Sequence, residues 1–120
     1  MIKQIEILNK DTLLVNITFI ENSNIAHIMN ISGKKNPWLI YISKNEKEYD
    51  ISICDVIKFL ETRCVPKTRE NIEELLSKKY HLKEYSPIGI CKQTHGVSNN
   101  DNIWLRFNSE ELRFDDVRVR

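Results

Sequence analysis

The chain has 120 residues, a hydrophobic fraction of 41%, a charged fraction of 29% and a net charge of +1. This size suits one domain with one core, so we expect residues 1–120 to form a single domain. The near-zero charge excludes a chain that binds nucleic acid or membranes through its overall charge, and leaves only a local basic patch for that role. No signal-peptide pattern opens the sequence, and no apolar run approaches the roughly 20 residues that span a bilayer. We therefore expect a cytoplasmic protein with no membrane partner.

The first segments alternate apolar and polar residues. Residues 2–8 and 12–20 flank the turn signal Asn9-Lys10-Asp11, which predicts a β-hairpin. Residues 25–31 fit either a strand face or a helical turn, and we favour the strand. Residues 38–43 are rich in β-branched and aromatic side chains, which favours another strand. These segments predict a small antiparallel sheet, followed by a charged connection.

Two short amphipathic helices around a tight turn are predicted over residues 50–76. Ser52 begins a capping-box pattern, and apolar residues then recur at helical spacing as far as Cys64. Pro66 must end this helix, and Thr68 is the expected N-cap of the second. The apolar faces predict one core residue from each helix in particular: Leu60 and Leu75.

A third helix and a further strand follow. Ser86-Pro87 is an N-cap followed by proline at the first helical position, which predicts a helix over residues 88–94 that stops at Gly96. Residues 103–107 have the composition of a strand. The expected fold is α+β, a small antiparallel sheet with two to three short helices: residues 1–50 mainly strands, 51–96 helical, and 97–120 strand and turn.

Enzyme chemistry has no sequence signal here. The phosphate-loop, dinucleotide-binding, zinc-protease and serine-hydrolase motifs are all absent. Cys91 and His95 stand four residues apart like a thiol and its base, but without a third group to orient them we interpret Cys91 as a core residue. We predict a protein that is not an enzyme and that needs no cofactor.

The cysteines are odd in number and form no CxxC pair: Cys54, Cys64 and Cys91. The three histidines, His27, His81 and His95, form no clustered ligand spacing with these cysteines, so we expect no metal site. Free thiols, buried or half-buried in a reducing cytosol, are the favoured interpretation.

A cationic cluster surrounds the turn between the two predicted helices: Arg63, Lys67 and Arg69. Such a cluster could bind a phosphate at a helix N-terminus, or open the recognition helix of a helix-turn-helix. Three glutamates in the same helix would repel a DNA backbone: Glu70, Glu73 and Glu74. The remaining alternative is structural, an arginine network that ties the turn to an acid elsewhere in the fold.

Two segments resemble a known family. FLETRCVPKTRENIEELL is similar to a signature Trp-Trp-x-x-Arg-x-Ile-Pro-x-x-Arg followed by an amphipathic helix. THGVSNNDNIWLRF and LRFDDVRV resemble its companion, Gly-Leu-Ser-x-x-Asp-x-Tyr-Trp-Ile and then Leu-Thr-Trp-x-x-Val-Asn. Both occur in the segment that precedes the kinase core of HipA-like Ser/Thr kinases of Firmicutes, and in small stand-alone proteins.

The resemblance covers roughly residues 38–119. The matching positions are Arg63, Pro66 and Arg69 in the first segment, and Gly96, Ser98, Asp101 and Trp104 in the second. Lys58-Phe59 or Phe59-Leu60 replaces the paired tryptophan, so that contact of the family is not carried over. Because the similar segment stops before the kinase core, no ATP-binding or catalytic residue is carried over either.

The resemblance implies an accessory domain that binds another macromolecule. We expect a regulatory or antitoxin-like partner of a HipA-like kinase. The alternative is a phage or mobile-element protein that binds a host protein or DNA and could act as an inhibitor. The predicted partner-binding residues are Arg63, Lys67, Arg69, Asp101 and Trp104. We further predict that Arg63 and Arg69 both lie near the 96–101 loop, where one of them bonds Asp101 and the other is left free for a ligand or for an acid of the partner. The oligomeric state stays open.

Overall fold

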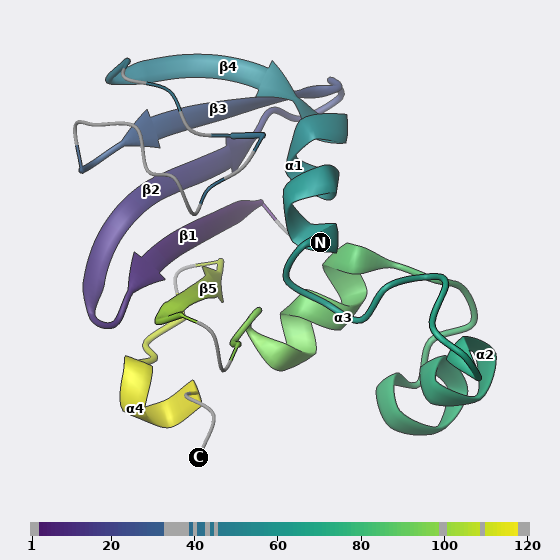
Figure 1. Ribbon diagram of the computed structural model, residues 1–120. Helices are drawn as coiled ribbons and strands as arrows, with labels where there is room; N and C mark the ends of the chain where they lie inside the picture. Colours follow the sequence, from purple (N-terminus) through teal and green to yellow (C-terminus); the bar gives the residue numbers. More distant parts are fainter. Residues whose placement is uncertain are drawn as a thin grey trace.

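Alternating apolar residues assemble into one five-stranded antiparallel sheet (Figure 1). The computed structural model describes residues 3–32, 39, 41–42, 44, 46–98, 101–108 and 110–117. The strands are β1 (Gln4–Asn9), β2 (Thr12–Phe19), β3 (Ile25–Asn30), β4 (Glu48–Ser52) and β5 (Ile103–Phe107). Their order is β4-β3-β2-β1-β5, so β5 from the end of the sequence lies beside β1.

The predicted hairpin and the strand over residues 25–31 are confirmed. β1 pairs with β2, with Asn9 opposite Thr12 at the turn, and β3 pairs with β2 on its other side. β4 was not predicted, because its residues were assigned to a charged connection and the start of a helix. Most of the strand predicted over residues 38–43 falls outside the described residues; Leu39, Tyr41 and Ile42, which are described, lie in bends or turns.

One face of the sheet forms the main core because inward-pointing residues of neighbouring strands lie opposite each other. Ile17 is paired with both Ile5 and Ile28, and all three are fully buried. Helix α1 (Ile53–Glu61) covers this face with three side chains that are 0% exposed: Val56, Phe59 and Leu60. Burying a side chain of this size contributes about 1.5–3 kcal/mol, so α1 is held firmly on the sheet.

Local chemistry sets both ends of α1. The Ser52 hydroxyl accepts a hydrogen bond of 3.1 Å from the Cys54 N–H, which confirms Ser52 as the N-cap. The helix ends at Glu61, earlier than predicted, because both the N–H and the hydroxyl of Thr62 donate to the Phe59 carbonyl. Cys64 therefore lies outside the helix.

Residues 65–85 form a helical arm that projects beside the sheet (Figure 1). The arm contains α2 (Ile72–Leu75) and the π-helical segment η1 (Leu76–Tyr80). The prediction that Thr68 caps a helix is wrong, since the helix begins at Ile72, after a residue in the left-handed conformation. Leu75 is only half-buried, also against expectation, while Leu76 enters a second small core with Tyr80 and Ile90.

Helix α3 (Pro87–Thr94) joins the arm to the sheet. The predicted cap is confirmed, because the Ser86 hydroxyl accepts a 3.0 Å hydrogen bond from the Gly89 N–H and proline begins the helix. A short helix α4 (Phe114–Val117) follows β5. The α+β fold class is thus confirmed. Within the described ranges, no helix is long and apolar enough to cross a membrane.

Candidate functional site

Arg63 lies at the point where the chain leaves α1. Its backbone N–H donates to the Leu60 carbonyl at 2.9 Å, which continues the last turn of the helix and aims the side chain toward β5. The side chain is 7% exposed. A guanidinium can be buried to this degree only when its donors and its charge are satisfied.

Asp101 supplies the counter-charge. The guanidinium donates to both of its carboxylate oxygens, with Nη1 at 2.7 Å from Oδ2 and Nη2 at 2.9 Å from Oδ1. Two carbonyl oxygens accept further hydrogen bonds: Gly96 from Nε at 2.9 Å and Ile103 from Nη2 at 2.8 Å. This bidentate arrangement requires the planar fork of an arginine, which lysine lacks.

The Asp101 carboxylate is held in its charged form. Burial by itself raises the pKa of this carboxyl, but hydrogen bonds from Arg63 and from the Ile103 N–H, together with the Arg63 charge, bring the pKa below its ordinary value. The pair joins the end of α1 to the start of β5, so its first consequence is structural.

Gly96 allows this close approach. It has a φ of +62°, and a Cβ there would lie 3.0 Å from Leu105 Cδ1 and 3.4 Å from Arg63 Cβ. Next to it, the His95 carbonyl accepts a 2.8 Å hydrogen bond from the Leu105 N–H. The left-handed glycine therefore brings the end of α3 against both Arg63 and β5.

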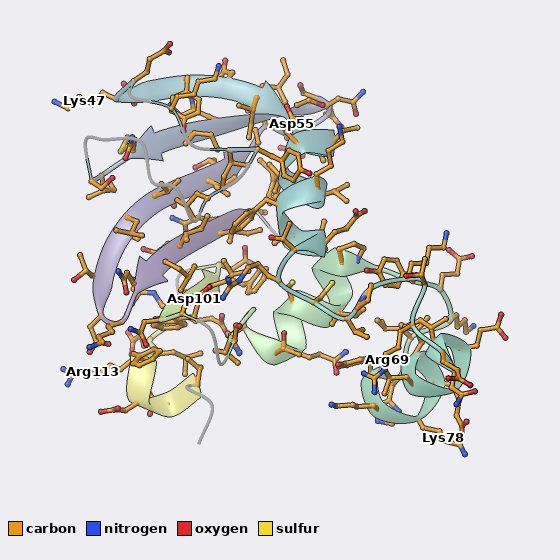
Figure 2. The ribbon with its side chains drawn as sticks, viewed as in Figure 1. Lys47, Asp55, Arg69, Lys78, Asp101 and Arg113 are labelled. Atoms are coloured by element: carbon orange, nitrogen blue, oxygen red, sulfur yellow. The ribbon has the colours of Figure 1, made fainter. Side chains whose placement is uncertain are left out.

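The two arginines of the predicted joint site lie in different parts of the structure. Arg63 lies against the 96–101 loop as expected, but Arg69 is exposed on the helical arm, apart from Asp101 (Figure 2). Arg69 lines a different hollow of about 300 Å³, together with residues of α2 and η1. The prediction that the arginine lies near this loop is therefore right for Arg63. It is wrong for Arg69, because Arg69 belongs to the arm, which projects away from the loop.

Trp104 was predicted to contact a partner, and its position contradicts this. Its side chain is 0% exposed, and its indole N–H donates to the Lys10 carbonyl oxygen. Arg106 lies over its ring, at 5.9 Å from the centroid. Trp104 therefore fills the interior and leaves no surface for a partner, and the low exposure of Arg63 and Asp101 limits them in the same way.

A second hollow, also of about 300 Å³, opens beside Arg63. It lies between the end of α1, the arm and α3, and its lining residues are Thr62, Arg63, Cys64, Val65, Tyr80, Ile90, Thr94, Val97 and Ser98. Its walls combine hydroxyls, one cation and the Cys64 thiol. Sequence reasoning missed this place, because its residues come from three separate segments and share no spacing pattern.

The described part of the chain was searched for groups of side chains that could bind a metal ion. No group of three histidine, cysteine, aspartate or glutamate side chains there is arranged to hold a metal ion. Cys91 and His95 do not form a dyad, since Cys91 is buried and the His95 ring hydrogen-bonds Glu110.

Comparison with models of known protein families, with curated protein sequences and with solved structures gave no match. The resemblance to the HipA-like segment thus stays a prediction, carried by the residues named for it.

Proposed function

We propose that this protein is a non-enzymatic binding protein that engages a protein partner through the basic turn of its helical arm. The turn carries Lys67 and Arg69, and both are exposed. Neither side chain forms an ion pair with any residue that the structure describes. Arg63, the third cation of the cluster, forms an ion pair with Asp101.

The observation that carries the proposal is the contrast between Arg63 and Arg69. Both match arginines of the signature that the sequence resembles. The Arg63 side chain is hydrogen-bonded to Gly96 and Asp101 within the fold, whereas the Arg69 side chain is exposed. An exposed arginine beside a hollow suits an interface, where arginine is enriched among the residues that dominate binding energy. Arg69 is therefore the better candidate for direct contact.

For the class of partner, we propose a HipA-like kinase that lacks this segment. This chain would then have a regulatory or antitoxin-like role. The support is the resemblance, which spans two segments in the order and at the spacing of the family.

Charge on the arm favours a protein partner over DNA. Acidic and basic side chains both line the hollow beside Arg69, and the Lys78 ammonium donates to the Glu74 carboxylate at 2.7 Å. A phosphate backbone needs a consistently basic surface.

The proposal is tested by reversing charge on the arm. The double variant Lys67→Glu/Arg69→Glu is compared by calorimetry with wild type for binding to a purified HipA-like kinase that lacks this segment. We expect at least about tenfold weaker binding, about 1.4 kcal/mol. The matched control is Lys3→Glu/Lys47→Glu, which reverses two exposed lysines of the sheet region and should bind as wild type does.

Four results would contradict the proposal. Failure of the wild-type chain to bind such a kinase removes the kinase as partner, and equal weakening in both double variants removes the arm as the interface. Specific duplex binding at physiological salt, abolished by Arg69→Ala, would instead support the phage or mobile-element alternative. Nucleotide turnover lost on changing one residue of this chain would show it to be an enzyme.

A further inference from the structure

At the β5 edge of the sheet, the chain itself satisfies the outward backbone groups. The N–H groups that point away from β1 belong to the odd-numbered residues Ile103, Leu105 and Phe107. Their acceptors are, in that order, the Asp101 carboxylate at 3.0 Å, the His95 carbonyl at 2.8 Å and the Glu110 carboxylate at 2.7 Å. This edge therefore has no row of free donors to offer another strand.

The opposite edge, formed by β4, is open. The Asn30 N–H donates to the Lys47 carbonyl at 2.8 Å, so Lys47 and every second residue after it point their backbone groups at β3. The residues between them point outward: Glu48, Asp50 and Ser52. All three are exposed, and within the described ranges no acceptor is hydrogen-bonded to their N–H groups. No described element lies beyond β4 (Figure 1).

The outer face along the β4 edge is acidic. The side chains of Glu48 and Asp50 are both more than half exposed, and His27 of β3 lies between the two carboxylates. Asp55 adds a further carboxylate in the first turn of α1, directly after β4 (Figure 2). An open edge is a template for another extended segment, and acidic side chains along it select a segment of opposite charge.

A second copy of β4 fits this edge poorly. A two-fold antiparallel pair centred on Asp50 sets that carboxylate opposite its own copy, and a pair centred on Tyr49 sets Glu48 opposite Asp50. Like charges directly opposite each other in a ladder are destabilising. A pair centred on Ile51 avoids this but is short, because the strand gives way to α1 at Ile53. The charges along β4 therefore disfavour a homodimer through this edge.

We propose that β4 accepts an extended, basic segment of another protein as a sixth strand of the sheet. The segment runs antiparallel to β4, as neighbouring strands do throughout this sheet. Backbone hydrogen bonds supply the affinity and alternate side chains the specificity. This surface is separate from the basic turn of the arm, so the proposal does not depend on a kinase partner.

The register of such a strand follows from the pleat of β4. Lysine or arginine side chains of the segment lie opposite Glu48 and Asp50 on the outer face, where each forms a cross-strand ion pair. The residues between them are apolar, since they lie beside Tyr49 and Ile51, whose buried side chains are on the core face. The recognised pattern is thus basic-apolar-basic.

The first test is amide exchange in the free, full-length chain, followed residue by residue by NMR. The N–H groups of Glu48 and Asp50 should exchange with deuterium almost without protection, whereas those of Tyr49 and Ile51, which face β3, should exchange slowly. Slow exchange at Glu48 and Asp50 would overturn the proposal, because the edge would already be covered.

The second test adds a blocked peptide, Lys-Val-Lys-Val-Lys, to the isotope-labelled chain at physiological salt. Its binding should shift the β4 amide signals and protect the N–H groups of Glu48 and Asp50 from exchange. Two control peptides should each bind at least about tenfold more weakly. One carries glutamate in place of lysine. The other keeps its lysines but is methylated on their backbone nitrogens, which removes the donors that face β4.

Charge reversal in the chain completes the experiment. Glu48→Lys/Asp50→Lys should bind the glutamate peptide more tightly than the lysine peptide. The matched control, Glu73→Lys/Glu84→Lys, reverses two exposed carboxylates outside the sheet and should behave as wild type does.

Three results with wild type alone would overturn the proposal, even where a variant fails to fold. The first is an absence of β4 shifts with millimolar lysine peptide. The second is equal binding of the methylated peptide, which would mean attraction of charge without strand pairing. The third is a dimer of the free chain with protected β4 amides, which would make a second copy the occupant of the edge.

Discussion

Arg63 spends most of its hydrogen-bonding capacity inside the molecule. Its fork reaches one carboxylate and two carbonyl oxygens, all at 2.7–2.9 Å. A buried ion pair of this kind adds little over a well-packed apolar pair, but the loss of one partner is costly, because the other charge stays buried. From the sequence, Arg63 is a candidate for binding a partner, but in the structure its charge and hydrogen bonds join two parts of the fold.

Arg63→Ala should lower the free energy of unfolding by about 3–5 kcal/mol, because it strands the Asp101 carboxylate. The measurement is urea unfolding followed by circular dichroism. Arg63→Met combined with Asp101→Leu should be less destabilising than the sum of the two single changes, since no charge is left unpaired. A loss below about 1 kcal/mol for Arg63→Ala would mean that the pair is exposed to solvent in solution.

His27 responds to pH on the other face of the sheet. It lies opposite Asp50 across β3 and β4, with Nδ1 at 2.7 Å from the Asp50 carboxylate and Nε2 at 3.3 Å from that of Glu48. These hydrogen bonds, with Asp50 first and then with Glu48, raise the pKa of His27 above its ordinary value of 6.5. The imidazolium is thus favoured in the folded state.

The contribution of His27 to stability should be fully present below pH 6.5 and lost as the pH rises through its higher folded pKa. An NMR titration of the imidazole proton should have a midpoint above 6.5, and Asp50→Asn should lower that midpoint. The gain in stability should be small, because the side chain is 37% exposed. A midpoint at or below 6.5 in the wild type would contradict the contact.

At the scale of elements, the helices belong to two cores of unequal size. α1 is packed on the sheet through the main core, while the arm has a small core of its own that includes Leu76, Tyr80 and Ile90. A segment with few buried apolar contacts opens at a lower free energy than the body of the domain. The arm should therefore open before the sheet and α1 do.

Leu60→Ala should destabilise the whole fold by about 2–5 kcal/mol, because it leaves a cavity in the main core. Leu76→Ala should act on the arm and leave the sheet protected. Hydrogen exchange separates the two effects, since Leu76→Ala should speed exchange over residues 72–82 and Leu60→Ala should speed it in β1 and β2 as well. Identical exchange patterns in the two variants would show that arm and sheet open as one unit.

At the scale of the whole molecule, the fold depends on contacts between distant parts of the sequence. β5 closes one edge of the sheet against β1, and the Arg63–Asp101 pair fastens α1 to the start of β5. The signature residues that the fold uses lie at this junction, whereas Arg69 lies on the projecting arm. Of the two arginines in the turn, Arg63 thus belongs to a structural junction and Arg69 to the exposed arm.

The sequence by itself determined what depends on near neighbours. Alternation predicted the hairpin and the third strand, and short-range capping chemistry predicted the starts of α1 at Ser52 and of α3 at Ser86. The α+β class follows from these elements. For the candidate site, the sequence named Asp101 as the acidic partner of one of the two arginines, and only the structure shows that this arginine is Arg63.

Only the tertiary structure decided the rest. Trp104 is fully buried and Arg69 lies away from the 96–101 loop, because both outcomes depend on how the sheet, α1 and the arm pack. The late start of α2 has the same origin, since a short helical segment takes its limits from tertiary packing, here against the small core that contains Leu76 and Tyr80. Contacts between residues far apart in the chain leave no periodic pattern of apolar residues in the sequence, so such a pattern could not predict them.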